Sequence, residues 1–316
     1  MSSSKSQQSE ISRQNGPSLF SQLASIHEQS GAKAIALAYY DYASETGLGI
    51  HADHWFHAAS TIKVPILIAL FGAIEKGRFE LDDRLHVRNR FYSVIGGEPF
   101  KVATSRDANS SVHRAIGKTM KLEQLAEHMI TTSSNLATNL LLDLIGIEES
   151  NKILHELGIE GIELHRGVED ERAFDAGIFN KVTANGLLKV FRLIEDRALF
   201  SPESSQRMLD ILHKQEFKSF IPAGLPSEAR VAHKTGEIST IAHDAGLVFL
   251  PDRKPYALVI LTEWDADKGG RSDTLAKVSR AVYQAINAQS DILRPLTEDV
   301  AAIAGANAST EGEPNE

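Results

Sequence analysis

Ser60 and Lys63 stand three residues apart, just before an almost wholly apolar run from Val64 to Ile74. In a helix, side chains at i and i+3 lie on one face, so the lysine amine can reach the serine hydroxyl. A serine in the first helical turn also lies beside free backbone N–H groups and the positive end of the helix dipole, which stabilise a developing oxyanion. The pair therefore predicts a nucleophile and its base.

A purely structural interpretation of the same pattern is helix capping. The Ser-x-x-Lys pattern is short, and Ser2 and Lys5 repeat it near the N-terminus. Serine is also a common residue at a helix start. The interpretation of Ser60 as a nucleophile therefore depends on the rest of the chain.

The helix that carries this pair is expected to run from about Ser60 to Gly77. Pro65 falls in or near the first turn, where backbone N–H groups have no helical partner, and glycine commonly ends a helix. The segment is apolar on nearly every face, which is typical of a buried core helix.

The composition indicates a globular protein. The 316 residues are 42 % hydrophobic and 24 % charged, with a net charge of −9 and no cysteine. This balance argues against nucleic acid or a membrane surface as a partner, and it excludes disulfides and a cysteine nucleophile. We expect a monomer that acts on a small molecule or a peptide.

Strand-like runs lie at both ends of the chain and helical patterns lie between them. Two runs within residues 32–53 form a predicted hairpin, and three more lie within residues 230–263, before a helix at about 270–288. We expect an α/β fold in which one antiparallel sheet is covered by the terminal helices and an all-α part is inserted. The predicted boundaries are a disordered tail at 1–17, one catalytic domain at 18–290 and a mobile tail at 291–316. Within the domain, the α/β part is 18–58 and 215–290, and the all-α part is 59–214.

Several further segments contain polar residues in suggestive patterns. Three histidines in 51–57 suggest a zinc site, but no second group of ligands completes one, and no metal is expected. The irregular segment 81–117 is expected to line or cover a site, and the acidic segment 158–180 is too long for a simple connection. His243 and Asp244 are expected to form a structural pair.

Three motifs, taken in order, resemble one enzyme family. Ser60-Thr-Ile-Lys63, Ser133-Ser-Asn135 between two predicted helices, and Lys234-Thr-Gly236 on a predicted strand are similar to the motifs of class A serine β-lactamases and penicillin-binding DD-peptidases. The resemblance spans about residues 33–288. It implies the β-lactamase fold and a hydrolase that forms an acyl-enzyme without a cofactor.

The resemblance also implies a role for each motif residue. Ser60 would attack the carbonyl carbon and Lys63 would take its proton. Ser133 would pass a proton to the leaving nitrogen. The implied substrate-binding residues are Asn135, Lys234, Thr235, Gly236 and Glu237, with the N–H groups of Ser60 and Glu237 forming the oxyanion hole.

The base for deacylation remains open between two glutamates. In class A enzymes, a loop glutamate after the second motif activates water within a Glu-x-x-Leu-Asn pattern, from which this chain departs. Glu169 is the first choice, because aligning the loop from Arg166 leaves it one position out of place. Glu171 is the rival, and in a third interpretation both are solvated carboxylates. Without such a base, a DD-peptidase, an esterase or a β-lactam or peptidoglycan-fragment binder without turnover becomes the alternative.

Three features depart from the family pattern. Ser134 stands where class A enzymes usually have aspartate, and Glu237 places a carboxylate where a small residue is common. The N-terminus lacks the apolar segment of a secretory signal. Taken literally, the sequence predicts a cytoplasmic protein, or a periplasmic or secreted one if the start codon is assigned wrongly.

Overall fold

The computed structural model describes residues 18–288, so the tails predicted at 1–17 and 291–316 lie outside the described residues. A five-stranded antiparallel sheet has the order β10-β11-β12-β1-β2. Its strands are β1 (Ala34–Asp41), β2 (Thr46–Ile50), β10 (Arg230–Ile238), β11 (Ile241–Phe249) and β12 (Tyr256–Glu263). Strands from both ends of the chain thus form one sheet, because β1 pairs with β12 along its whole length. The predicted fold class is confirmed.

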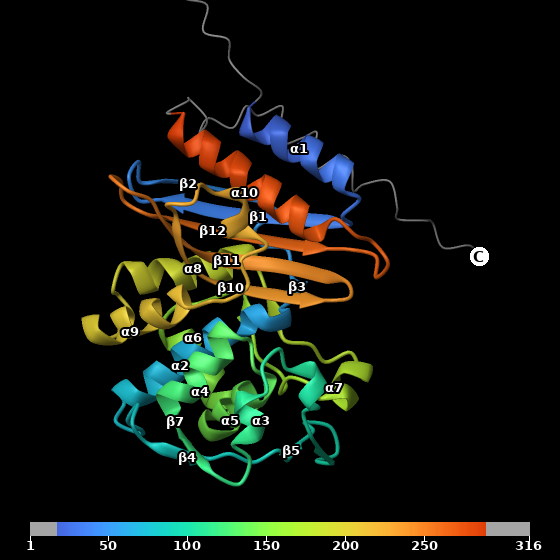
Figure 1. Cartoon of the computed structure of the whole chain (residues 1–316), viewed down its shortest axis with the longest axis vertical. Helices are drawn as coiled ribbons and strands as arrows, with labels where there is room; N and C mark the ends of the chain where they lie inside the picture. The colour runs from blue at the N-terminus through green and yellow to red at the C-terminus, as the bar shows by residue number, and fades with distance from the viewer. Residues whose placement is uncertain (1–17, 289–316) are drawn as a thin grey trace, which may run out of the picture.

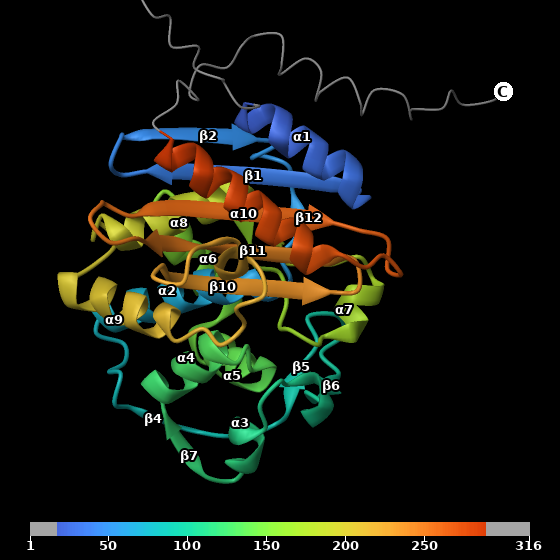
Figure 2. The same cartoon turned by 45° about the horizontal axis from the view of Figure 1, so that its top comes forward.

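Helices cover both faces of the sheet. On one face lie α1 (Leu19–Ser30) and α10 (Arg271–Asn287), as Figures 1 and 2 show, and on the other lies α8 (Ala184–Glu195). Successive residues of a strand point to opposite faces. Leu258 and Ile260 of β12 accordingly join the cluster with α1 and α10, whereas Val259 joins the larger core that includes α8.

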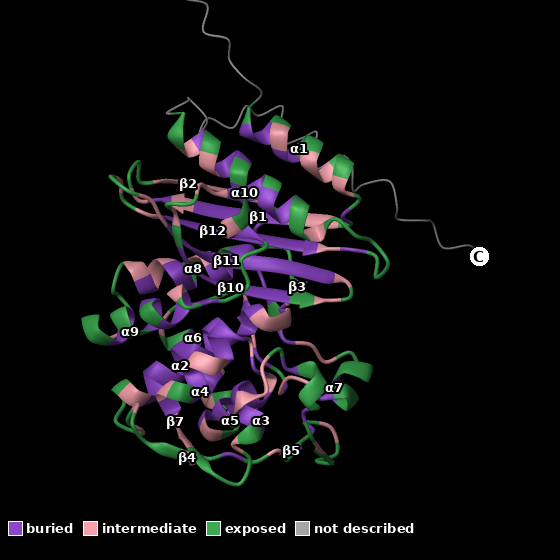
Figure 3. Cartoon of the chain, viewed as in Figure 1, coloured by how far each residue is buried: buried purple, intermediate pink, exposed green. Residues whose placement is uncertain are grey.

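The second half of the molecule is built around α2 (Lys63–Glu75), which is buried along almost its whole length (Figure 3). Around it pack α4 (Leu122–Thr131), α5 (Asn135–Ile145) and α6 (Ile147–Glu156), while α9 (Pro202–His213) packs against α4 and β10. At Gly72, an added Cβ would lie 2.7 Å from Ile153 Cγ2, so the missing side chain lets α2 and α6 approach closely.

Short elements connect these layers. A small sheet pairs β3 (Phe56–His57) and β8 (Ile162–Glu163) with β9 (Lys181–Val182). One ribbon, at residues 91–92 and 99–100, forms within the segment predicted to be irregular, and a second pairs residues 84–86 of that segment with residues 119–121 just after it. The remaining elements are β4 (Arg84–His86), β7 (Thr119–Lys121), β5 (Phe91–Tyr92), β6 (Pro99–Phe100), η1 (Ala59–Ile62), η2 (Thr104–Arg106), α3 (Ser111–Arg114), α7 (Glu171–Asp175) and η3 (Ile221–Gly224).

Two elements differ from the sequence expectation. The helix predicted from Ser60 opens as the 3₁₀ turn η1, and its α-helical part begins at Lys63. The second is α8, which the sequence placed within the all-α part. It packs on the sheet instead, because its apolar residues Leu187, Val190 and Phe191 join the larger core that also contains strand residues. Within residues 18–288, no helix is both long and apolar enough to cross a membrane.

Candidate active site

A cleft of about 820 Å³ lies between the edge strand β10 and the turn η1 that leads into α2. Side chains from six separate stretches of the chain line it. They include Ser60, Arg106, Ser133, Asn135, Glu169, Glu171, Thr235 and Glu237. The structure therefore brings residues of all three sequence motifs to one cavity.

Ser60 lies in the turn η1, half-buried at the cleft wall. The strand β10 passes very close to this turn at Gly236. An added Cβ at Gly236 would lie 3.0 Å from the backbone nitrogens of Ser60 and Thr61, so only glycine fits without displacing the backbone. Glu237 follows directly, so both residues predicted to form the oxyanion hole line the cleft.

Lys63 is fully buried and donates three hydrogen bonds. Its Nζ lies 2.6 Å from Ser133 O, 3.0 Å from Ser133 Oγ and 2.7 Å from Asn135 Oδ1. Burial lowers the pKa of Lys63 to about 7, against the opposing effect of the carboxylates of Asp107 and Glu169. Near neutral pH, the amine is therefore available in both protonation states.

The Ser133 hydroxyl lies between two lysine amines. Its Oγ accepts hydrogen bonds from Lys63 and from Lys234, the second at 3.1 Å. Burial lowers the pKa of Lys234 well below its usual value, and the nearby charge of Lys63 lowers it further. Ser133 also has a φ of +57°, a left-handed conformation that is uncommon for serine. A hydroxyl held between two amines has a ready route for proton transfer.

Asn135 connects the lysine to the acidic loop. Its Oδ1 accepts from Lys63, while its Nδ2 donates to Glu169 Oε1 at 3.0 Å and to Arg106 O at 3.1 Å. These partners fix the orientation of the amide, because its oxygen can only accept and its nitrogen can only donate.

The two candidate glutamates occupy different environments. Glu169 faces the cleft with its side chain 15 % exposed, and its Oε2 forms an ion pair with Arg106 Nε at 2.6 Å. Glu171 is 77 % exposed at the start of α7 and lies 3.9 Å from Arg106. Because only Glu169 contacts Asn135, it is the loop glutamate that joins the motif residues.

Known proteins resemble this chain in sequence and in fold. A family model described as "Beta-lactamase enzyme family" matches residues 18–286. The chain belongs to the β-lactamase enzyme family. A β-lactamase of Bacteroides uniformis is 28 % identical over 182 residues, which are 53 % of this chain and 61 % of that protein.

Solved structures share the fold of this β-lactamase-family protein. A point variant of PBP-A, seen as an acyl-enzyme complex with penicillin G, is 29 % identical with a TM-score of 0.72, covering 85 % of this chain and 96 % of that one. A variant of the class A β-lactamase of the last common ancestor of Gram-negative bacteria is 26 % identical with a TM-score of 0.74, covering 86 % and 100 %. The fold is thus that of class A β-lactamases and PBP-A.

Asparagine side chains hold the acidic loop of this β-lactamase-family protein against the helical half. Asn139 Nδ2 donates to Val168 O at 2.8 Å, and its Oδ1 accepts from Val168 N at 2.9 Å. Asn180 Oδ1 accepts from the N–H of Arg166, and its Nδ2 donates back to Arg166 O. Glu169 follows the clamped Val168 with a φ of +63°, which turns its side chain into the cleft.

Two histidines near Ser60 act as structural groups. His57 Nδ1 accepts the Ala59 N–H at 3.0 Å, and burial lowers the pKa of His57 to about 4. His243 Nδ1 accepts the Thr262 N–H, so its Nε2–H donates to His57 O at 3.1 Å. This bond ties β11 to the segment that leads into Ser60.

The predicted His243–Asp244 pair is wrong. Asp244 contacts His233 instead, with Oδ1 at 2.9 Å from His233 Nδ1, and it accepts the Ile221 N–H. Adjacent residues of a strand point to opposite faces, so His243 and Asp244 cannot face each other.

Two site residues were missed by sequence reasoning. Arg106 and Asp107 lie at the end of the turn η2, in the segment that was only expected to line or cover a site. Arg106 pairs with Glu169, and Asp107 contacts the backbone of Asn135. No motif marks either residue, because both act through contacts with distant parts of the chain.

Proposed function

We propose that this protein is a serine β-lactamase that opens β-lactam amides through an acyl-enzyme on Ser60. The observation that supports this best is the buried Lys63, which donates hydrogen bonds to Ser133 and Asn135, two residues that line the same cleft as Ser60. Membership of the β-lactamase family independently supports a hydrolase acting on small molecules of this kind.

In the acylation step, the Ser60 hydroxyl oxygen attacks the lactam carbonyl carbon while Lys63 takes the hydroxyl proton. A neutral amine has two N–H groups and one lone pair, so Lys63 must release one of its three present bonds to accept this proton. The C–N bond of the lactam then breaks, and Ser133 passes a proton to the ring nitrogen. Lys63 resupplies Ser133 through their 3.0 Å contact.

Charge in this step develops on the carbonyl oxygen, next to the Ser60 and Glu237 N–H groups. One such donor contributes about 3 kcal/mol of transition-state stabilisation. Thr235 lines the cleft and Lys234 is buried directly behind it, where its Nζ donates to Thr235 O at 2.8 Å; together they would hold the substrate carboxylate. Their cationic and hydroxyl groups match the anion that most β-lactams carry.

Deacylation requires water to attack the ester carbon with help from a base. Glu169 would remove the proton of that water, since it lies in the cleft beside Asn135. Its ion pair with Arg106 keeps the carboxylate oriented between the two partners. General-base assistance of this kind is worth about 10²- to 10⁴-fold in rate.

A penicillin-binding enzyme or binder without turnover is the second candidate. The structural likeness to PBP-A at 29 % identity favours it, because that neighbour is seen as an acyl-enzyme with penicillin G. The two candidates share acylation on Ser60 and differ only in the lifetime of the ester.

Intact-protein mass spectrometry over time, after mixing with a chromogenic cephalosporin or benzylpenicillin, tests the proposal. We expect a transient adduct and rapid colour change, both absent in Ser60→Ala. A persistent adduct would favour the penicillin-binding alternative. No adduct at all would overturn both candidates and leave only the family and fold.

Replacing Glu169 with glutamine should separate acylation from deacylation. We expect Glu169→Gln to form the Ser60 adduct and to hydrolyse it about 10²- to 10⁴-fold more slowly, because the amide cannot accept the water proton. Glu171→Gln is the matched control and should keep nearly wild-type turnover, since its side chain is largely in solvent. Rapid turnover by Glu169→Gln, or a stalled adduct in Glu171→Gln, would contradict the assignment.

A further inference from the structure

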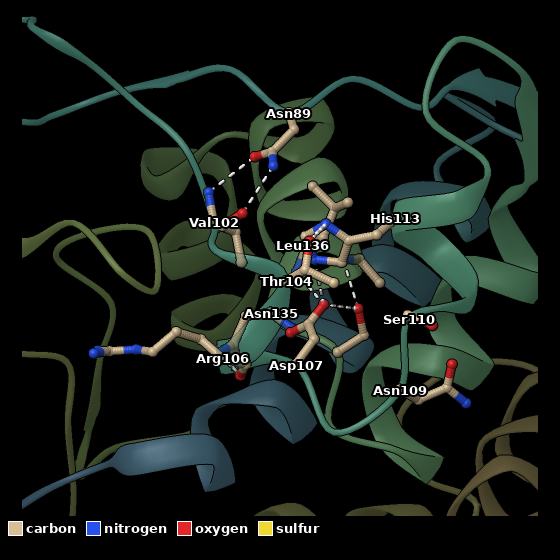
Figure 4. Close-up of polar contacts among 12 residues, drawn as sticks. Asn89, Val102, Thr104, Arg106, Asp107, Asn109, Ser110, His113, Asn135 and Leu136 are labelled. Carbon is tan, nitrogen blue, oxygen red and sulfur yellow. Dashed lines mark hydrogen bonds and ion pairs between the residues drawn. The ribbon is translucent and has the colours of Figure 1, made fainter.

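The carboxylate of Asp107 is wholly buried behind the second motif and accepts from four donors (Figure 4). Two of these donors belong to the motif itself. The distances are 2.5 Å from Asn135 N, 2.9 Å from Ser134 Oγ, 3.1 Å from His113 Nε2 and 3.4 Å from Leu136 N. A carboxylate in the interior is stable only when its oxygens are hydrogen-bonded in this way.

These bonds hold a strained turn. Ser133 adopts a φ of +57°, which for a residue with a side chain persists only when its surroundings enforce it. Asp107 accepts hydrogen bonds from the two residues that follow, Ser134 and Asn135, and so fixes the exit from the turn. Ser134 Oγ also accepts from Ala137 N and caps α5, so the same contact anchors the helix start.

The turn η2 and Asp107 contact both the second motif and the acidic loop. Besides the Asp107 carboxylate, the Arg106 carbonyl accepts from Asn135 Nδ2, and the Arg106 side chain pairs with Glu169. Asn135 is therefore held at its backbone by Asp107 and at its side chain by Arg106. In this orientation, Asn135 Oδ1 accepts a hydrogen bond from Lys63.

Position 134 holds a serine, which has no carboxylate, so the carboxylate behind the second motif comes from Asp107. The family resemblance leads one to expect aspartate there, and this chain has serine. The Ser134 hydroxyl donates to Asp107, so a carboxylate is present at this place but is supplied from position 107. An aspartate in place of Ser134 would face Asp107 across a 2.9 Å contact and repel it.

We propose that Asp107 is a positioning residue for the reaction at Ser60, holding Ser133 and Asn135 in place with a carboxylate supplied from position 107 rather than from position 134. This inference rests on the proposed function for the role of Ser133. Its structural content, the anchoring of residues 133–136, does not depend on turnover.

A charge-swap series tests the proposal. In Asp107→Asn, the new NH₂ group meets hydrogen-bond donors, and we expect acylation to slow about 10- to 100-fold, as small misplacements of reacting groups do. Ser134→Asp alone should also slow acylation, through repulsion from Asp107. The double variant, which combines Asp107→Asn with Ser134→Asp, reverses the polarity of the contact, because the new amide donates to the new carboxylate. Its acylation rate should recover to within about fivefold of wild type.

A pH profile distinguishes positioning from general destabilisation. The groups that act on Lys63 by charge are Asp107, Glu169 and Lys234. Removing the negative charge of Asp107 favours neutral Lys63, so the acidic limb of the acylation profile should move to lower pH in Asp107→Asn and return in the double variant. Asp143→Asn, which removes an exposed partner of Arg88 on α5, is the control and should change neither rate nor profile.

Hydrogen–deuterium exchange provides a readout that needs no activity. The Asn135 and Leu136 amides should exchange about tenfold or more faster in Asp107→Asn and slow again in the double variant. If wild-type protein forms no adduct while exchange follows this pattern, the proposed function fails and the anchoring stands. Normal acylation and exchange in Asp107→Asn, or no recovery in the double variant, would overturn the inference. If Asp107→Asn does not fold, wild-type acylation and exchange by Ser134→Asp alone would overturn it.

Discussion

At the residue scale, Lys63 is a buried amine whose charge depends on its neighbours. Burial disfavours the protonated form, while the carboxylates of Asp107 and Glu169 favour it. The outcome is a pKa of about 7, far below that of a solvated lysine. A base with its pKa near the working pH is efficient, because it is both available and basic enough.

The rate of Ser60 acylation should therefore depend on pH through Lys63. Protonation removes the lone pair, so the rate should fall by about tenfold per unit below pH 7, where the amine gains its proton. Stopped-flow measurement of acylation from about pH 5 to about pH 9 checks this. A rate that stays level across the acidic half of that range would show that Lys63 is not the base.

The negative charge of Glu237 should have a measurable effect on the binding of anionic substrates. Its side chain is exposed and lines the cleft beside Thr235, where an anionic substrate group would bind. We expect Glu237→Gln to lower KM for anionic β-lactams by about two- to fivefold, with less effect at high salt, because screening already weakens an exposed charge. Glu228→Gln, exposed and outside the residues lining the cleft, is the control. An unchanged KM at low salt would mean that the carboxylate points away from bound substrate.

At the element scale, loops that carry site residues are held by asparagine side chains. Asn139 pairs with both backbone groups of Val168, Asn151 with those of Leu164, and Asn89 with those of Val102. Each side-chain amide donates one hydrogen bond and accepts one, as the backbone of a neighbouring strand would. A loop without a strand partner thus gains two directed bonds, which satisfy buried backbone groups.

Asn139→Ala should release the segment before Glu169. Loss of two hydrogen bonds leaves the backbone of Val168 unpaired, at an expected cost of about 1–3 kcal/mol in the free energy of unfolding. Deacylation should slow more than acylation, since Glu169 loses its fixed support while Ser60 and Lys63 keep theirs.

Asn151→Ala is the matched control for this experiment. It removes the same pair of bonds at Leu164, outside the residues that line the cleft. We expect a similar loss of stability with little change in the ratio of the two rates. Equal kinetic effects in both variants, measured by single-turnover experiments, would argue against a specific role for the Asn139 clamp.

At the scale of the whole molecule, one hydrophobic core joins the sheet to the helical half. It contains α2 residues such as Leu67, α8 residues such as Phe191, and sheet residues such as Val259. The cleft lies at this junction, so its geometry depends on both halves staying packed together. Close packing of this kind transmits small displacements, because interiors hold few voids.

Leu67→Ala should test how far the site depends on this core. Leu67 is fully buried in α2, and the cavity left by truncation should cost about 2–5 kcal/mol in the free energy of unfolding. Ile116→Ala, at a side chain 45 % exposed, should cost far less. Urea unfolding followed by circular dichroism measures both. A loss below about 1 kcal/mol for Leu67→Ala would mean that the core collapses around the missing side chain.

The sequence by itself determined the features that depend on local pattern. Strand-like runs separated by short turns predicted the antiparallel sheet, and the apolar run after Lys63 predicted the central helix α2. The three motifs could be recognised because each consists of residues that are close together in the sequence. Such features can be predicted from the sequence, since hydrophobic periodicity and the short spacing of motif residues do not depend on long-range contacts.

Only the tertiary structure decided the contacts between distant segments. Two glutamates in the acidic loop were both candidates by spacing, and in the structure only Glu169, after the clamped Val168, contacts Asn135, whereas Glu171 is largely exposed. Asp107 reaches Asn135 across 28 positions of the chain, which no periodicity encodes. These choices depend on packing of α5 against two loops, and packing is a property of the whole fold rather than of any local run of residues.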